Sequence, residues 1–455
     1  ISAQSGRGKT RLLEEAARQA RDKGMIVLFV RGRMLSHGAG APLCQELAGG
    51  LKESFLASSS QMREMAQQLG FWSKLLARAF PPFRGLTNES YDFQPQTTAL
   101  VDAWTALLEK LAARNDFLLI FDDLQWADTF TLEWLSRGEA CGAKILTAFR
   151  TEESARLISL PGIHDQTLEL GVLSQQSSRD LVLSMTGPLP PSVLEMLTVR
   201  AGGDPFLLQS LVWGAYEMKV ITPTEEGWAW TGEGLQAGLE GGAVLANRLD
   251  LLNSEGRQLL RAAAVLGKEF VLDQAFFVAE FGEGLGKDAW HECRERQFLW
   301  EEGGQAGFTH DKIREAVLAD TTDKQVKELH ARAAEWLYLH SPEADRELAL
   351  HLAGARRDRE ALEHAARGVR AAATRLDFPT VESLQRLIVE STSRLGMSKE
   401  RVRGCLELGR SLSRRASYGE AIEYLREGLK SASDPDELLD LRIELSFALV
   451  KSSRL

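Results

Sequence analysis

The stretch AQSGRGKT, Ala3 to Thr10, lies where a short apolar segment gives way to a helical pattern. Gly6 and Gly8 allow backbone N–H groups to turn toward an anion, and a helix that begins near Lys9 adds the partial positive charge of its N-terminus. Apolar residues at helical spacing continue to Lys23, and Gly24 ends the pattern. The stretch therefore fits the Walker A pattern of a phosphate-binding loop, with Ala3 in place of the usual first glycine.

The residues around this loop indicate a parallel sheet. An apolar run of strand length follows the helical pattern, so that strand, loop, helix and strand succeed one another as in a βαβ unit. Residues 42–114 are mostly helical in pattern, with a break near Pro81 and Gly85. The strands predicted after the loop are residues 25–30, 117–121 and 144–149, with a helix at 129–137 and a candidate fifth strand at 166–170.

A second motif ends the strand predicted at residues 117–121, which runs into two carboxylates. Asp122 is placed to hold Mg²⁺, and Asp123 lies where a base could polarise an attacking water. In the loop, the Lys9 ammonium can reach the β- and γ-phosphates, and the Thr10 hydroxyl can ligate the metal. Taken alone, the first motif could be a glycine turn before a helix, and the second a strand whose acidic end meets solvent. Together they predict binding of a purine nucleoside triphosphate, ATP with Mg²⁺.

Two further residues allow two interpretations each. Arg150 follows the strand predicted at residues 144–149, at the carboxyl edge where parallel sheets bind ligands. It either senses the γ-phosphate or is a solvated arginine at a strand end. His310 stands near a predicted helix start, where a histidine is either a ligand or a capping and packing residue.

The composition is that of a globular protein of about three domains. The chain has 455 residues, of which 44% are apolar and 26% charged, and 54 basic against 64 acidic residues give a net charge of −10. That charge disfavours a large basic face for nucleic acid. The four cysteines are scattered and the apolar runs too short for a bilayer, so we expect a cytoplasmic protein without a membrane segment. The sequence starts almost inside the loop and stops within a helical repeat, as an internal fragment of a longer protein would.

Beyond Leu173 the pattern becomes largely helical. Helices are expected at residues 177–185, 192–201, 205–218 and 256–266, and short β-segments at 227–230 and 298–308 suggest a two-stranded wing. From Asp323 onward helix follows helix, and Glu407–Ser431 is spaced like a tetratricopeptide repeat, with a weaker match at 362–389. The predicted architecture is an α/β P-loop domain with a parallel sheet (1–172), a helical domain (173–240), a winged helix (241–322) and a TPR-like α-solenoid (323–455).

Taken in order, these motifs resemble the STAND class, signal-transduction ATPases with numerous domains, within the AAA+ superfamily. The segment LLIFDDLQWADTFTLEWL, Leu118 to Leu135, is similar to the branch found in large ATP-binding LuxR-type regulators and in multidomain kinases and cyclases. GKTRLLEE, ILTAFR, AGGDPFLLQSLV, NRLDLLNSEGRQLLRAAAVLG and FTHDKIREAV extend the resemblance over nearly the whole chain.

The resemblance implies a role for each matching residue. Arg150 corresponds to the sensor-1 arginine, Gly203 and Pro205 to a GxP motif whose proline packs near the adenine, and His310 to the histidine that contacts the β-phosphate of ADP in a closed state. The implied catalytic residues are Lys9, Asp122, Asp123 and Arg150, the magnesium ligands Thr10 and Asp122, and the nucleotide-binding residues Ser5, Gly6, Arg7, Gly8, Lys9, Thr10, Arg11, Pro205 and His310.

The sequence departs from the pattern of the STAND class at two positions near the acidic motif. Asp123 is one methylene shorter than the glutamate of fast AAA+ ATPases, so slow hydrolysis is expected. Gln125 stands where many relatives have histidine in LDDLHWAD.

Three functions fit the sequence. The first is a switch, in which ADP holds a closed state, exchange for ATP opens it, and self-association brings attached effectors together while the repeats bind an inducer or partner protein. The second is a continuously hydrolysing remodelling ATPase, and the third is a scaffold with an inactive nucleotide site. DNA contact would come only from domains outside this sequence.

Overall fold

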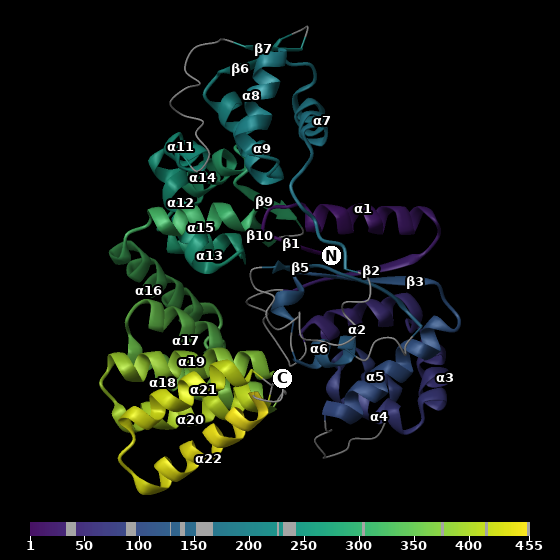
Figure 1. Ribbon diagram of the computed structural model, residues 1–455, viewed down its shortest axis with the longest axis vertical. Coiled ribbons are helices and arrows are strands. Elements are labelled where there is room, and N and C mark those ends of the chain that lie inside the picture. The colour runs from purple at the N-terminus through teal and green to yellow at the C-terminus, as the bar shows by residue number, and fades with distance from the viewer. Residues whose placement is uncertain are drawn as a thin grey trace. The chain divides into compact units, whose positions relative to one another are not determined.

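The computed structural model (Figure 1) describes residues 1–32, 42–87, 97–127, 129–136, 142–151, 167–224, 227–230, 243–302, 305–374, 377–414 and 417–452. Contacts divide the chain into two compact units. The first unit contains residues 1–4, 9–169 and 362–455, and the second contains residues 5–8 and 170–361. Each unit has hydrophobic clusters of its own.

The first unit contains a parallel sheet. β2 (Ile26–Arg31) pairs with β3 (Phe117–Asp122), and β3 pairs with β4 (Lys144–Thr147). β1 (Ser2–Ala3) pairs with β5 (Phe149–Arg150) on one side and with Glu169 on the other. Because only Ala148 separates β4 from β5, the order across the sheet is β2, β3, β4–β5, β1 and the segment at Glu169. The predicted strands are confirmed, and the fifth is reduced to this bridge, with Gln166 outside the described residues.

Helices cover both faces of this sheet (Figure 1), and successive side chains of its strands point to one layer and then to the other. Phe117, Leu119 and Phe121 of β3 lie in a cluster with the helices between β2 and β3, whereas Ile120 faces Leu13 of the first helix. Since successive strand residues point to opposite faces, an uninterrupted apolar run is what a strand buried on both sides requires. The helical elements of this part are α1 (Lys9–Asp22), α2 (Pro42–Phe55), α3 (Ser59–Leu69), α4 (Phe71–Ala79), η1 (Pro81–Leu86), α5 (Thr97–Ala112), η2 (Leu124–Trp126) and α6 (Thr129–Ser136).

The second unit begins with three helices and a hairpin. Leu197 of the second helix and Leu208 and Leu211 of the third are fully buried in one cluster. The hairpin pairs the predicted segment at residues 227–230 with a strand that the sequence did not reveal, because Pro223 weakens its pattern. The bounds are α7 (Gln175–Thr186), α8 (Pro191–Ala201), α9 (Pro205–Glu217), β6 (Ile221–Thr224) and β7 (Gly227–Trp230).

The next segment has one leading helix and then the helix–strand–helix–helix–strand–strand order of a winged helix. It comprises α11 (Ala243–Asp250), α12 (Ser254–Leu266), β8 (Glu269–Phe270), α13 (Leu272–Val278), α14 (Glu283–Glu295), β9 (Leu299–Glu302) and β10 (Gln305–Phe308), and α15 (Asp311–Asp320) follows. The expected two-stranded wing is a three-stranded antiparallel sheet with β10 in the middle. β8 has two residues, too few to produce a periodic signal.

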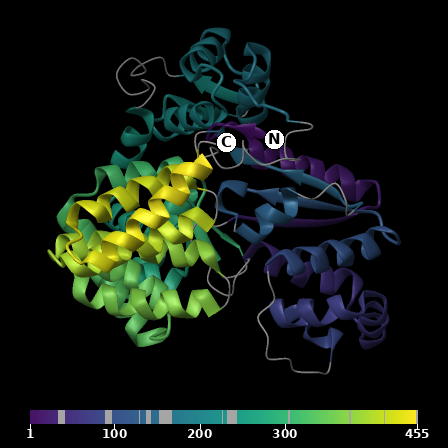
Figure 2. The ribbon, with the colours of Figure 1, turned by 60° about the horizontal axis from the view of Figure 1, so that its bottom comes forward.

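Antiparallel helices make up the rest of the chain, and Figure 2 shows the last of them side by side in yellow and green. They are α16 (Asp323–His340), α17 (Asp345–Gly354), α18 (Asp358–Thr374), α19 (Phe378–Arg394), α20 (Ser398–Arg414), α21 (Tyr418–Ser431) and α22 (Pro435–Ser452). A Cβ atom on Gly409 of α20 would lie 2.5 Å from the Leu425 side chain of α21, so glycine permits this close crossing. Small residues at such crossings explain the repeat-like spacing of Glu407–Ser431.

A buried histidine pair in the second unit should make stability depend on pH. Nδ1 of His330 in α16 lies 2.9 Å from Nδ1 of His351 in α17. Burial is the first cause that lowers both pKa values, to about 4 for His330, beside Arg314, and to about 3 for His351. As the pH falls, these two histidines therefore bind protons at a higher pH in the unfolded chain than in the folded chain. The free energy of unfolding should be unaffected by these groups above about pH 6.5 and decrease steadily toward about pH 4.

Urea unfolding at pH 7.5 and pH 5 checks this expectation. The loss of stability between the two values should be smaller in a His330→Leu/His351→Leu variant than in the wild type. His291→Ala serves as the control, since that side chain is 74% exposed. An equal pH dependence in all three proteins would contradict the assignment.

Two global properties follow from the described residues. None of their helices is both long enough and apolar enough to cross a bilayer. Cys44, Cys293 and Cys405 are buried, and burial raises the pKa of the Cys405 thiol to about 11. These three side chains therefore pack as small apolar groups.

Candidate functional site

The loop between β1 and α1 has the backbone that a phosphate-binding loop needs. Gly6 and Gly8 have φ values of +85° and +89°, in the region that side chains with a Cβ disfavour. α1 begins at Lys9, as predicted. Lys9 is 7% exposed, and its ammonium donates to the carbonyl oxygens of Ala3 at 2.8 Å and Gln4 at 2.9 Å. It is thus held over its own loop, where phosphate oxygens could replace these carbonyls.

Thr10 and Asp122 meet within the first unit, although they are 112 positions apart in the sequence. The Thr10 hydroxyl donates to Oδ2 of Asp122 at 2.7 Å, and Arg31 Nε lies 3.5 Å from the same oxygen. Asp122 is fully buried, and burial followed by the charge of Asp123 raises the pKa of its carboxyl. A hydroxyl and a buried carboxylate form the oxygen set that Mg²⁺ prefers, so these residues fit the predicted metal.

Asp123, Gln125 and Arg150 form one hydrogen-bonded group, here called the carboxylate clamp. The Gln125 side chain donates from Nε2 to Oδ1 of Asp123 at 2.9 Å, and its Oε1 accepts from the Arg150 backbone N–H at 3.1 Å. Arg150 Nε lies 3.7 Å from the same Asp123 oxygen, and both charged side chains are 9% exposed. The arginine is therefore a buried partner of the acidic motif and not a solvated residue.

The backbone of Asp123 is fixed in an unusual conformation. Its φ of 51° and ψ of 46° lie in the left-handed region. The end of β2 approaches it closely: the Gly32 N–H donates to the Asp122 carbonyl at 2.8 Å, and a Cβ on Gly32 would lie 2.3 Å from the Asp123 carbonyl oxygen. Glycine at position 32 is thus required for the turn that presents Asp123.

Replacing Gly32 with alanine should destabilise the protein by about 1–3 kcal/mol, because the new methyl group overlaps a backbone atom that cannot move independently. ATP hydrolysis should fall with it, since Asp123 must shift. Gly49→Ala is the matched control: it lies inside α2, where a Cβ meets no atom within 4 Å. Urea unfolding that gives equal stabilities for the two variants would refute the steric argument.

The second unit gathers side chains around Gly6, and we call this group the loop-tip cluster. A Cβ on Gly6 would lie 3.1 Å from Cβ of Phe206, 3.3 Å from Nζ of Lys312 and 3.5 Å from Nε2 of His310. His310 caps α15 by accepting at Nδ1 from the Lys312 N–H at 3.1 Å. Because Nδ1 accepts, the proton of the neutral ring is on Nε2, the nitrogen nearest Gly6.

Asp204 and Arg7 adjoin the loop-tip cluster, and together with Lys312 they place two cations and one carboxylate there. Asp204 Oδ2 lies 3.3 Å from Lys312 Nζ and 3.9 Å from Arg7 Nη1, while its Oδ1 accepts from the Leu207 N–H and caps α9. Pro205 takes the first position of that helix, as its ring favours. With a donor from His310 added, the charges around the loop favour an anionic ligand.

Residues 1–137 match the family model of the AAA ATPase domain. They are an AAA ATPase domain. Nucleotide binding follows from membership of this family. None of the curated proteins matches the chain.

A solved structure with a TM-score above 0.5 shows the fold of the whole chain. A Signal Transduction ATPase with Numerous Domains (STAND) protein with a tetratricopeptide repeat sensor, from Pyrococcus horikoshii, matches 100% of the chain with a TM-score of 0.53 and 16% identity. The chain spans 60% of the length of that structure. A Walker-type ATPase of Pyrococcus abyssi matches 70% of the chain and 89% of its own length, with 11% identity and a TM-score of 0.30. The chain therefore has an AAA ATPase domain followed by a largely helical region, in the fold of a STAND protein with tetratricopeptide repeats.

The structure places the predicted residues in the two units separately. The first unit brings Thr10 to Asp122 and Asp123 to Arg150, and the second brings His310 to Gly6. Arg11 joins neither group, because its side chain is 81% exposed and pairs with Glu14. The residues that sequence reasoning did not identify are Arg31, Gly32, Asp204, Phe206 and Lys312, and Gln125 was noted without a role.

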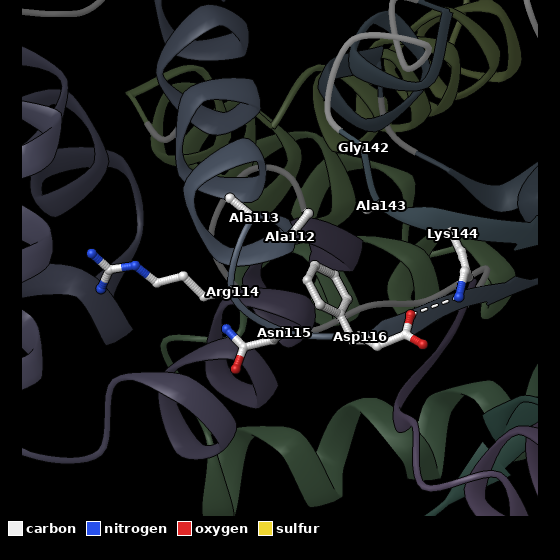
Figure 3. A pocket seen from close by; sticks show the side chains of 9 residues that line it. Ala112, Ala113, Arg114, Asn115, Asp116, Gly142, Ala143 and Lys144 are labelled. Carbon is white, nitrogen blue, oxygen red and sulfur yellow. Dashed lines mark hydrogen bonds and ion pairs between the residues drawn. The ribbon is translucent and has the colours of Figure 1, made fainter.

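A separate pocket lies in the AAA ATPase domain and the segment after it, with a volume of about 360 Å³. Figure 3 shows the side chains that line it. It is lined by residues 112–117 and 142–144, with an Asp116–Lys144 ion pair at 2.6 Å. These residues precede or begin β3 and β4, so the pocket lies at the amino ends of the strands. The phosphate-binding loop and the acidic motif follow the carboxyl ends of β1 and β3, where ligands of parallel sheets bind.

Proposed function

We propose that this chain is the switching part of a STAND-type signalling protein, closed with ADP and opened by exchange for ATP. The observation that carries the proposal is the position of His310, whose Nε2 donor faces the phosphate-binding loop at Gly6. A donor at this point suits a phosphate oxygen of a nucleotide held by the loop. Phosphate contact would then stabilise the packing of residues 5–8 against the winged helix.

Mg²⁺ is the proposed cofactor, held by Thr10 and Asp122. When bound, it would neutralise the charge that develops on the phosphates. Lys9 would bind phosphate oxygens, Arg150 would sense the terminal phosphate, and Asp123 would accept a proton from the attacking water. Pro205 would pack near the adenine. The Asp123 side chain is one methylene shorter than that of glutamate, and its carboxylate is engaged in the carboxylate clamp. We therefore expect slow hydrolysis that resets the switch.

A switch requires only that ADP and ATP bind its two packings differently. In the open state, surfaces released from the closed packing would self-associate and bring attached effectors together. The helical repeats would bind an inducer or a partner protein. The scattered cysteines of the sequence suit a reducing cytoplasm.

The dissociation rate of a fluorescent ADP analogue tests this proposal. His310→Ala removes one donor to a charged oxygen, a contact of about 1.5 kcal/mol or more, so dissociation should be at least roughly 10-fold faster. His340→Ala is the control, because that exposed histidine stacks on Trp336 at the end of α16. Dissociation that is equally fast in the wild type and in His310→Ala would refute the closed state, and rapid steady turnover would favour a remodelling ATPase.

A further inference from the structure

Gln125 occupies a position at which both ends of its amide are used. Its Nε2 donates to the Asp123 carboxylate at 2.9 Å and its Oε1 accepts from the backbone N–H of Arg150 at 3.1 Å. The side chain thereby connects the turn after β3 to the end of β5. Among uncharged side chains of this length, glutamine alone carries a donor and an acceptor on one carbon atom.

The surrounding backbone is already fixed without Gln125. The Leu124 N–H donates to the Ala148 carbonyl at 2.9 Å, the Trp126 N–H donates to the Asp123 carbonyl at 3.0 Å, and Gly32 packs against that carbonyl. These contacts determine the path of the main chain through the turn. What they leave undetermined is the orientation of the Asp123 carboxylate about its side-chain bonds.

The Gln125 amide contributes to that orientation. It engages Oδ1, the oxygen that Arg150 Nε approaches to 3.7 Å. Asp123 and Arg150 are both nearly buried, so the hydrogen bond acts where water screens little. A glutamate at position 125 would put a second carboxylate oxygen against Asp123, and an apolar side chain would leave the buried Arg150 N–H without this acceptor.

We infer that Gln125 is a positioning residue for ATP hydrolysis, which acts by holding the Asp123 carboxylate against Arg150. This inference rests on the proposed function, in which Asp123 receives the proton of the attacking water and Arg150 senses the terminal phosphate. Gln125 touches neither nucleotide nor metal in this role. Its loss should therefore change the rate of the chemical step and leave nucleotide affinity intact.

The test is a double-mutant cycle on the full chain with Gln125→Met, Asp123→Asn and the double variant. Single-turnover hydrolysis of ATP gives the rate, and a fluorescent ADP analogue gives the dissociation constant. Gln125→Met should lower the rate roughly 10-fold, the lower end of the effect of losing an outer hydrogen-bond partner. The dissociation constant should stay within about twofold of the wild type.

The cycle separates positioning from a merely structural role. If Gln125 acts through Asp123, the double variant should be as slow as Asp123→Asn alone, because residues that act as a unit are not additive. Gln125→Glu, with a like charge against Asp123, should be at least as slow as Gln125→Met. Gln45→Met is the matched control: this glutamine also donates from a partly buried amide, to the Ala79 carbonyl at 3.0 Å, and its loss should leave the rate unchanged.

The outcomes are distinct. Suppose that the wild type hydrolyses ATP and that Asp123→Asn slows it. This inference alone would then be overturned if Gln125→Met kept the wild-type rate. It would also be overturned if Gln125→Met slowed the double variant by its full single-variant effect. A wild type that binds no nucleotide would overturn the proposed function. An equal loss of rate in Gln45→Met and Gln125→Met would show a general loss of stability, and so would also overturn the positioning role.

Discussion

Lys9→Ala is expected to weaken the binding of ADP and ATP at least about 100-fold. The Lys9 ammonium lies over the loop and already donates to the Ala3 and Gln4 carbonyls, so it needs little rearrangement to donate to phosphate oxygens. Two hydrogen bonds to charged oxygens contribute about 3 kcal/mol or more together, and 1.4 kcal/mol is a tenfold change in affinity. Isothermal titration with ADP, without and with Mg²⁺, measures the loss.

Lys23→Ala provides the control for this measurement. Lys23 is an exposed lysine just beyond the end of α1, so its loss changes the net charge equally without reaching the loop. Thermal unfolding of the two proteins without nucleotide shows whether Lys9→Ala is folded. A folded Lys9→Ala protein that binds ADP as tightly as Lys23→Ala would mean that the nucleotide does not bind at the phosphate-binding loop.

The second large effect is expected from Asp122→Asn, which should reduce Mg²⁺-dependent ATP hydrolysis at least about 100-fold. The carboxylate is fully buried and accepts from Thr10, and the amide that replaces it is a neutral and much poorer ligand for Mg²⁺. ADP binding without Mg²⁺ should be nearly unchanged, because the phosphates are held by the loop. Phosphate release at saturating ATP, over a range of Mg²⁺ concentrations, is the measurement.

The raised pKa of Asp122 adds a pH dependence with a definite sign. Mg²⁺ requires the ionised carboxylate, and burial together with Asp123 favours its protonated form. The Mg²⁺ concentration needed for half-maximal hydrolysis should therefore increase as the pH is lowered, starting above the usual range of an aspartate. Asp116→Asn, near the other end of β3 with 64% exposure, is the matched control. Hydrolysis that survives in Asp122→Asn but fails in Asp116→Asn would contradict the metal site.

Long, locally encoded features of the fold could be predicted from the sequence. The run from Phe117 to Phe121 has five apolar residues because both faces of β3 are covered, and this pattern is visible without the structure. β6 and β8 could not be predicted in this way. Each depends on its partner strand, and neither has a periodicity of its own.

Some residues of the candidate site could be predicted from local motifs, and others could not. Lys9, Thr10 and Asp122 belong to motifs whose spacing encodes their chemistry, and Thr10 does contact Asp122. Gln125 meets Arg150, and Lys312 meets Asp204, only when distant segments come together. No local pattern distinguishes such a residue from an ordinary polar side chain.

The need for glycine at position 32 also could not be predicted from the sequence. Its neighbour in the sequence, Arg31, ends a predictable strand, but the need for glycine comes from Asp123, 91 residues away by the difference of their numbers. The packing of neighbouring strands brings these backbones together. A single glycine after a strand gives no sign of it.

The central claim is tested most directly by the nucleotide that the purified protein carries. The protein is washed free of added nucleotide and denatured, and the released compounds are separated and quantified by chromatography, with Lys9→Ala and His310→Ala treated in parallel. A closed switch predicts ADP near one molecule per chain in the wild type, none in Lys9→Ala, and less in His310→Ala because of faster exchange. An empty wild-type site combined with rapid ATP hydrolysis would contradict the switch.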